Sequence, residues 1–209
     1  SFISFFSTTI LALSSEWAIS DKSKVRLISA KTSIDNNDEV FLGLEYQLDP
    51  GWKTYWKSPG DGGFAQIISW NNSTNIKNIN VLWPTPIEFE ILGLTSLGYK
   101  NNVIFPLDIE IEDISKDTFI NLHINYLICE KICIPGDARI FLEIPAGEKK
   151  LTNKYFNVEQ ALSLLPEKNF NSSYLHNINT NVFKNNDYST IQFIFESEKK
   201  FYNPEIFLH

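Results

Sequence analysis

Several short stretches of this chain alternate between apolar and polar residues. Between Ile120 and Ile128 every second residue is apolar, and the residues in between are mostly polar. A period of two residues is typical of a β-strand that buries one face against a core. Related strand patterns occupy residues 40–48, 103–111 and 140–144. The hydrophobic pattern therefore predicts that strands dominate this part of the chain.

Clusters of turn-forming residues separate these predicted strands. Asp, Asn, Gly, Pro and Ser favour turns, and they gather at residues 35–38, 49–51, 58–63, 100–102 and 135–137. Many short strands at a spacing of roughly ten residues are typical of two packed antiparallel sheets. We therefore expect an all-β sandwich over residues 15–147.

The pattern changes after residue 147. Residues 148–150 are charged, and a more apolar stretch then ends at Pro166. Within it, Asn157 and Gln160 have the spacing of a helix N-cap and its capping-box partner. We predict a linker with one short helix over residues 148–175. Strand patterning resumes near residue 177, so we predict that residues 176–209 begin a second, truncated β domain, because one or two strands cannot form a domain alone.

The chain starts with a mostly apolar run over residues 2–13. Such a run is too short to span a bilayer comfortably, but it has the length of the apolar region of a secretory signal. We interpret residues 1–14 as a signal-peptide remnant, and a first β-strand or buried segment is the alternative. Export would place the chain in an oxidising compartment, where disulfides persist.

The charge of the chain argues against one class of partner. The 209 residues carry a formal net charge of −7. Nucleic-acid binding needs clustered basic residues that neutralise phosphates. We therefore expect no nucleic-acid partner.

The most specific chemical feature is a pair of cysteines, Cys129 and Cys133, which are the only two in the sequence. This spacing allows a small-loop disulfide, half of a metal site or a redox-active dithiol. Zinc needs three or four ligands, and the three histidines do not gather around the pair in sequence, so we predict no metal. Disulfide stabilisation grows with loop length. So small a ring favours a redox role, and a structural disulfide is the alternative.

Other residues near the pair carry weaker signals. Trp52, Tyr55 and Trp56 lie within one ten-residue stretch, and they either close one end of the sandwich or line a wall beside the cysteines. Lys131 lies between the cysteines, where its charge would favour a thiolate, and the neighbouring Glu130 opposes that effect.

Four segments in order resemble one family. They are Pro50–Gly63, Leu82–Pro86, Leu97–Tyr99 and Tyr126–Pro135. Together they resemble the N-terminal periplasmic domain of the DsbD thiol:disulfide interchange protein, and more closely its ScsB-like branch. The resemblance covers roughly residues 25–147.

The resemblance implies a fold and an activity. Members carry a redox-active cysteine pair on an immunoglobulin-like sandwich and act as thiol:disulfide oxidoreductases. Electrons come from a thioredoxin-like domain, which a membrane-embedded domain of the same protein supplies, and they pass to periplasmic disulfide proteins. By this likeness Cys133 would form the mixed disulfide and Cys129 would resolve it. No cofactor is needed, because the sulfurs are the redox centre. The chain would be periplasmic, and the full-length protein would be anchored in the inner membrane.

The resemblance also implies a cap over the cysteines. In the family a loop with an aromatic residue shields the disulfide. The matching stretch here is Glu88–Leu94, where Ile91 or Leu92 stands in place of the aromatic. We therefore predict that the wall or cap of the site consists of Trp52, Tyr55, Ile91, Leu92, Tyr99 and Lys131.

Two other functions are compatible with the sequence. One is a non-enzymatic interaction module that a structural disulfide stabilises. The other is a copper- or zinc-handling domain, because ScsB-like proteins are linked to copper tolerance. In that case His123 would be a metal ligand.

Overall fold

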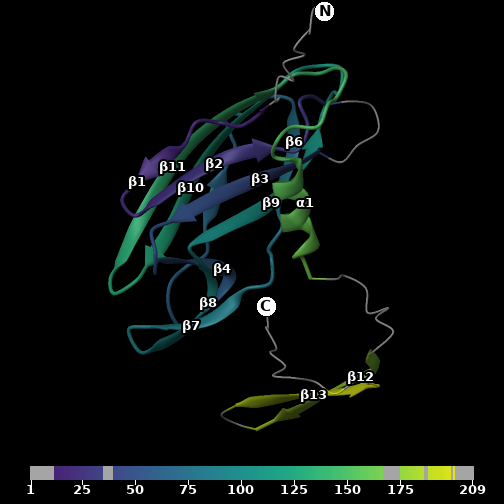
Figure 1. Cartoon of the computed structure of the whole chain (residues 1–209). Coiled ribbons are helices and arrows are strands. Elements are labelled where there is room, and N and C mark those ends of the chain that lie inside the picture. The colour runs from purple at the N-terminus through teal and green to yellow at the C-terminus, as the bar shows by residue number, and fades with distance from the viewer. Residues whose placement is uncertain (1–11, 35–39, 167–174, 186–187, 199, 201–209) are drawn as a thin grey trace, which may run out of the picture. The chain divides into compact units, whose positions relative to one another are not determined.

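The computed structural model describes residues 12–34, 40–166, 175–185, 188–198 and 200 (Figure 1). The chain divides into two compact units, residues 1–165 and 166–209. Among the described residues, no helix has the length and apolar character needed to cross a membrane.

The first unit is a sandwich of two antiparallel sheets. One sheet has the order β1 (Ala18–Ser20), β2 (Ser23–Ser29), β3 (Val40–Leu48), β9 (Asn102–Ile111) and β6 (Ile76–Val81). The other has the order β11 (Cys133–Ile144), β10 (Thr118–Cys129), β4 (Lys53–Gly60), β8 (Leu94–Lys100) and β7 (Ile87–Ile91), and β5 (Ile67–Ser69) pairs with β10. The predicted immunoglobulin-like β-sandwich is confirmed.

The core lies between the two sheets. Tyr46 of β3 is fully buried, and its ring meets Phe105 at 5.4 Å and Tyr126 of β10 at 5.2 Å, both edge to face. The even-numbered residues of β10 from Ile120 to Ile128 are all buried. The alternation in the sequence therefore identified the inward face of β10 correctly, and its odd-numbered residues face outward.

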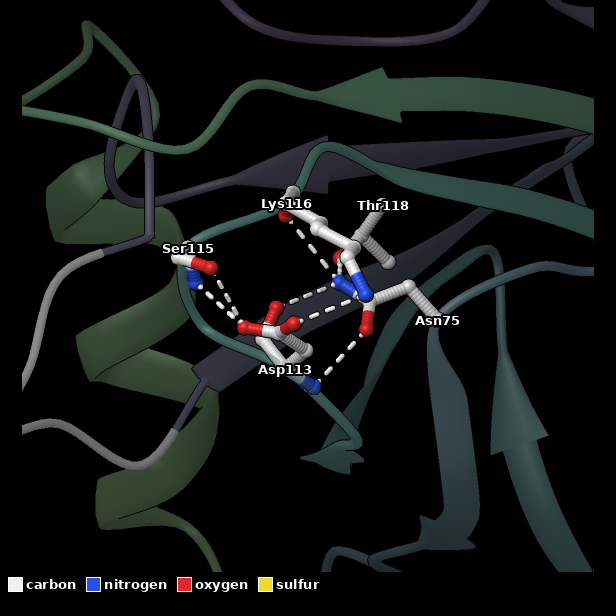
Figure 2. A network of polar contacts seen from close by, with 5 residues as sticks. All are labelled: Asn75, Asp113, Ser115, Lys116 and Thr118. Carbon is white, nitrogen blue, oxygen red and sulfur yellow. Dashed lines mark hydrogen bonds and ion pairs between the residues drawn. The ribbon is translucent and has the colours of Figure 1, made fainter.

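A polar network holds the turn between β9 and β10 (Figure 2). The Asn75 amide donates to the backbone oxygens of Asp113 and Lys116 at 2.8 and 3.0 Å and to Thr118 Oγ1 at 3.0 Å. The Asp113 carboxylate accepts from the hydroxyl and backbone N–H of Ser115 and pairs with Lys116 Nζ at 2.9 Å. These hydrogen bonds from Ser115, followed by Lys116, lower the pKa of Asp113 to about 2.

The helix α1 (Tyr155–Ser163) belongs to the first unit. Val158 is fully buried and packs against Ile28 and Ala30, so the segment that we predicted as a linker contains an element of the sandwich. The predicted capping box is wrong. Lys154 occupies the N-cap without a side-chain hydrogen bond, and Asn157 and Gln160 lie inside the helix, because the burial of Val158 sets where the helix lies.

The two ends of the chain concern the predicted signal-peptide remnant and the predicted second β domain. Most of the apolar N-terminal run lies outside the described residues, but the backbones of Leu13 and Ser15 hydrogen-bond to β2. In the second unit, β12 (Leu175–Lys184) and β13 (Ser189–Ser197) form an antiparallel pair. That they begin a second β domain stays a prediction.

Candidate functional site

The two cysteines face each other where β10 and β11 join. Cys129 is the last residue of β10 and pairs with Cys133, the first residue of β11. Between them, the backbone N–H of Glu130 donates to the oxygen of Ile132 at 3.0 Å. The cysteines are therefore a non-hydrogen-bonded pair, the kind whose Cα atoms lie closest in an antiparallel ladder. Their Cα atoms are 4.1 Å apart and their sulfurs are bonded. The return strand β11 thus starts at Cys133, well before the strand pattern predicted at residues 140–144.

The two sulfur-bearing residues differ sharply in exposure. Cys129 is fully buried, whereas Cys133 is exposed. Of the two cysteines, Cys133 alone is open to solvent at this strand end. Strand alternation does turn Cys129 away from the sandwich core, but Tyr55 and Ile91 cover it there and form a second, smaller apolar cluster. A reactant from solvent therefore reaches the disulfide from the Cys133 side.

Tyr55 is the polar contact of the buried sulfur. Its hydroxyl donates to Cys129 Sγ at 3.0 Å and lies 4.0 Å from Cys133 Sγ. Burial raises the pKa of Tyr55, so the hydroxyl keeps its proton at neutral pH and remains a donor. The ring packs against Phe89 at 5.9 Å between centroids. Of the three aromatics in the predicted stretch, Tyr55 is the one that meets the sulfurs.

The hairpin of β7 and β8 forms a cap over Cys129. Ile91 is buried against Cys129 and Tyr55, and Phe89 packs on the same cluster. Leu92 and Gly93 form the turn, with φ of 54° and 78°, and Leu92 is 73% exposed at the tip. Ile91 therefore lies at the site and Leu92 points away. Sequence reasoning missed Phe89, although its spacing of two residues from Ile91 places both side chains on one face of a strand.

Two predicted wall residues lie elsewhere. Tyr99 pairs with Thr54 in the ladder, so it shares the face of Thr54, opposite that of Tyr55. Its hydroxyl donates to the oxygen of Pro84 at 2.7 Å, and its ring meets Phe105. Trp52 precedes β4 and is buried, but it does not belong to the cluster that covers Cys129. These two predictions are corrected, because they depended on strand positions that the sequence did not specify.

Three charged residues lie near the pair, one on β4 and two in the turn between the cysteines. Lys53 is the ladder partner of Cys129 on β4, and its Nζ lies 5.7 Å from the centroid of Phe89. Lys131 is exposed in the turn between the cysteines, next to the half-buried Glu130. Opposite charges thus lie side by side in the turn.

His123 lies on the outer face of β10, six residues before Cys129. Its Nε2 is 2.6 Å from Asp137 Oδ2 on β11. Within the described part of the chain, no three side chains from among His, Cys, Asp and Glu come together as metal ligands.

This geometry agrees with the result of a family comparison. The family model described as thiol:disulfide interchange protein DsbD, N-terminal, matches residues 24–145, which is more than half of the chain. The chain belongs to this family. The bonded pair Cys129–Cys133 lies within the matched residues. This DsbD N-terminal domain therefore has a role in thiol:disulfide interchange.

A solved structure supports the fold of the DsbD N-terminal family. The N-terminal periplasmic domain of ScsB from Proteus mirabilis superposes with a TM-score of 0.61 at 22% sequence identity. The match covers 88% of this chain and 83% of that one. A comparison with curated proteins found no match.

Proposed function

We propose that the domain relays electrons by disulfide exchange at Cys129–Cys133. The observation that carries this proposal is the asymmetry of the bond. One sulfur belongs to an exposed residue, and the other is buried beneath a hydroxyl donor and an apolar cap. A bond of this kind offers one sulfur for attack and stabilises the other as the leaving group.

The first half of the relay reduces the domain. A thiolate of a reduced partner attacks Cys133 Sγ, the Cys129–Cys133 bond breaks, and its electron pair leaves on the Cys129 sulfur. A second partner thiolate then attacks the partner sulfur of the mixed disulfide, and Cys133 leaves as a thiolate. The partner becomes a disulfide, and the domain gains two electrons and takes up two protons.

The second half returns the pair to its oxidised state. The Cys133 thiolate attacks the disulfide of a downstream protein and forms a new mixed disulfide. The Cys129 thiolate then attacks Cys133 Sγ, which restores the intramolecular bond and releases the downstream protein as a dithiol. The two electrons have passed through the domain, and no further group is needed.

Tyr55 assists both halves by acting on Cys129. A hydrogen bond to the leaving sulfur stabilises the thiolate, and a leaving thiol of lower pKa departs faster. Because burial keeps the Tyr55 hydroxyl protonated, it remains a donor in both redox states. Ile91 keeps water from the same sulfur. Lys131 and Lys53 add positive charge near the pair, which favours thiolates, and Glu130 beside Lys131 opposes this effect.

The family and the exposure of Cys133 suggest the electron donor and the electron acceptors of the domain. We propose a thioredoxin-like domain as electron donor, supplied by a membrane-embedded domain of the same protein, and periplasmic disulfide proteins as acceptors. Family membership supports this assignment. The similar ScsB domain is described as periplasmic, which supports the same location for this chain.

Trapping of partners tests the proposal. Cys129→Ser leaves the exposed Cys133 without its resolving thiol, so it should accumulate mixed disulfides with periplasmic proteins after rapid alkylation. Cys133→Ser is the matched control, because its remaining thiol is buried, and it should trap far less. A bond that is only structural would give no difference between the two variants, and that outcome would overturn the relay.

A further inference from the structure

The loop that follows β4 contains a glycine in close contact with Tyr55. Gly63 has φ of +83°, in the left-handed region that favours glycine. A Cβ at Gly63 would lie 2.2 Å from both Cε1 and Cζ of the Tyr55 ring. No real Cβ contact is that short, so the ring occupies the space that any other residue would need. The backbone of Gly63 is thus one surface of the pocket around Tyr55.

Two other glycines show that a left-handed backbone does not by itself bring a close contact at the Cβ position. Gly93 has φ of +78° and Gly147 has φ of +136°, but a Cβ at either position would meet nothing within 4 Å. Gly63 therefore meets two demands at once, a left-handed backbone and the absence of a side chain. The second demand comes from Tyr55 alone among the nearest atoms.

The position of the Tyr55 ring determines the position of its hydroxyl. The ring lies between β4 and the cap, where Phe89 and Ile91 pack on it, and Gly63 closes a further side. A hydrogen bond to sulfur weakens steeply as its geometry departs from the optimum. A shift of the ring by the space of one methyl group would therefore remove the 3.0 Å contact between the hydroxyl and Cys129 Sγ.

We propose that Gly63 is a positioning residue for disulfide exchange, which acts by holding the Tyr55 hydroxyl on the sulfur of Cys129. The inference rests on the proposed function, because it concerns the same bond. When a partner thiolate bonds to Cys133 Sγ and the Cys129–Cys133 bond breaks, the electron pair remains on Cys129. Tyr55 then donates a hydrogen bond to that thiolate and keeps its own proton.

Gly63→Ala tests the inference through the reactivity of the disulfide. In the whole chain, this variant should slow reduction by dithiothreitol several-fold. In a Cys133→Ser background it should raise the pKa of the Cys129 thiol by about one unit, a tenfold loss of thiolate, as expected for a lost hydrogen bond to a charged group. Gly147→Ala is the control for backbone strain, because a Cβ there would meet nothing within 4 Å, and it should leave rate and pKa unchanged.

A double-mutant cycle identifies Tyr55 as the intermediary. Tyr55→Phe keeps the ring but removes the hydroxyl, so it should reproduce both effects, and adding Gly63→Ala should then change the rate and the pKa no further. Equal effects of Gly63→Ala with and without the hydroxyl would overturn the inference, as would a loss of stability with unchanged rate and pKa.

If Gly63→Ala folds poorly, a double-mutant cycle on the free energy of unfolding provides a second test. Tyr55→Ala removes the ring that the new methyl group would meet, so the same substitution should cost less stability in that background. An equal cost in both backgrounds would contradict the contact. Failure of the proposed function is separate, because Cys129→Ser would then trap no partner even if the pKa of Cys129 still responds to Gly63.

Discussion

At the scale of single residues, the sequence identified the cysteine pair, and the alternation of residues 120–128 places Cys129 on the face of β10 opposite the core. It also grouped Trp52, Tyr55 and Tyr99 as one wall, and the structure separates them. Tyr55 reaches the sulfur, while Tyr99 turns inward because it is the ladder partner of Thr54. The pairing between strands far apart in sequence determines on which face of the sheet each side chain lies. Local alternation of apolar and polar residues does not reveal that pairing.

Asp113 gives a prediction of pH dependence at this scale. Its pKa is lowered from 3.8 to about 2 in the folded chain, first by Ser115 and then by Lys116. A lowered folded-state pKa contributes stability that is present above the unfolded value and is lost as pH falls through the folded value. Asp113→Asn should therefore lower the melting temperature at pH 7.

The difference in melting temperature between wild type and Asp113→Asn should shrink between about pH 4 and pH 2. Lys116→Gln serves as comparison. It should have the smaller effect at pH 7, because Ser115 is the larger cause. A difference that stays constant down to pH 2 would show that the carboxylate does not stabilise this turn.

At the scale of elements, the strands with clear alternation, β3, β9, β10 and β11, were predictable, whereas β4, β7 and β8 beside the site were not assigned from the pattern. The cap was predictable only in part. The family resemblance placed the cap at Glu88–Leu94, and the structure forms a hairpin there from β7 and β8. Which side chain reaches Cys129 depends on the two-residue turn, which puts Leu92 at the tip and Ile91 on the cluster. The start of α1 was missed because Val158 packs on β2, a contact with distant residues.

The cap gives a prediction with a matched control. Ile91→Ala opens space over Cys129, so the disulfide should be reduced by a small thiol several-fold faster, with a loss of about 2–5 kcal/mol of stability as for other buried Ile→Ala changes. Leu92→Ala, one residue away at the exposed tip, should change neither quantity. Equal reduction rates for Ile91→Ala and wild type would mean that the hairpin does not limit access to the sulfur.

At the scale of the whole molecule, we expect the sandwich to stay folded without its disulfide. The core between the sheets contains Tyr46, Phe105 and Tyr126 and their aliphatic neighbours, whereas the bond closes only a tight turn. Disulfide stabilisation falls with the length of the closed loop and reaches about 3 kcal/mol for a loop of 15 residues. We therefore expect the first unit to keep one fold in both redox states.

This independence predicts that reduction costs little stability. Urea unfolding of the oxidised and reduced chain should give free energies that differ by no more than about 2 kcal/mol, with the far-ultraviolet circular dichroism of the sheets unchanged. Unfolding of the chain on reduction alone would instead assign the bond a structural role.

The reduction potential of Cys129–Cys133 tests the central claim most directly. The whole chain would be equilibrated with glutathione buffers of defined potential, and the fraction of free thiol measured after alkylation. An exchangeable bond should titrate at a potential above about −300 mV, within the range of disulfide-exchange proteins. A pair that stays oxidised below that potential would behave as a structural disulfide, and the electron-relay account would be contradicted.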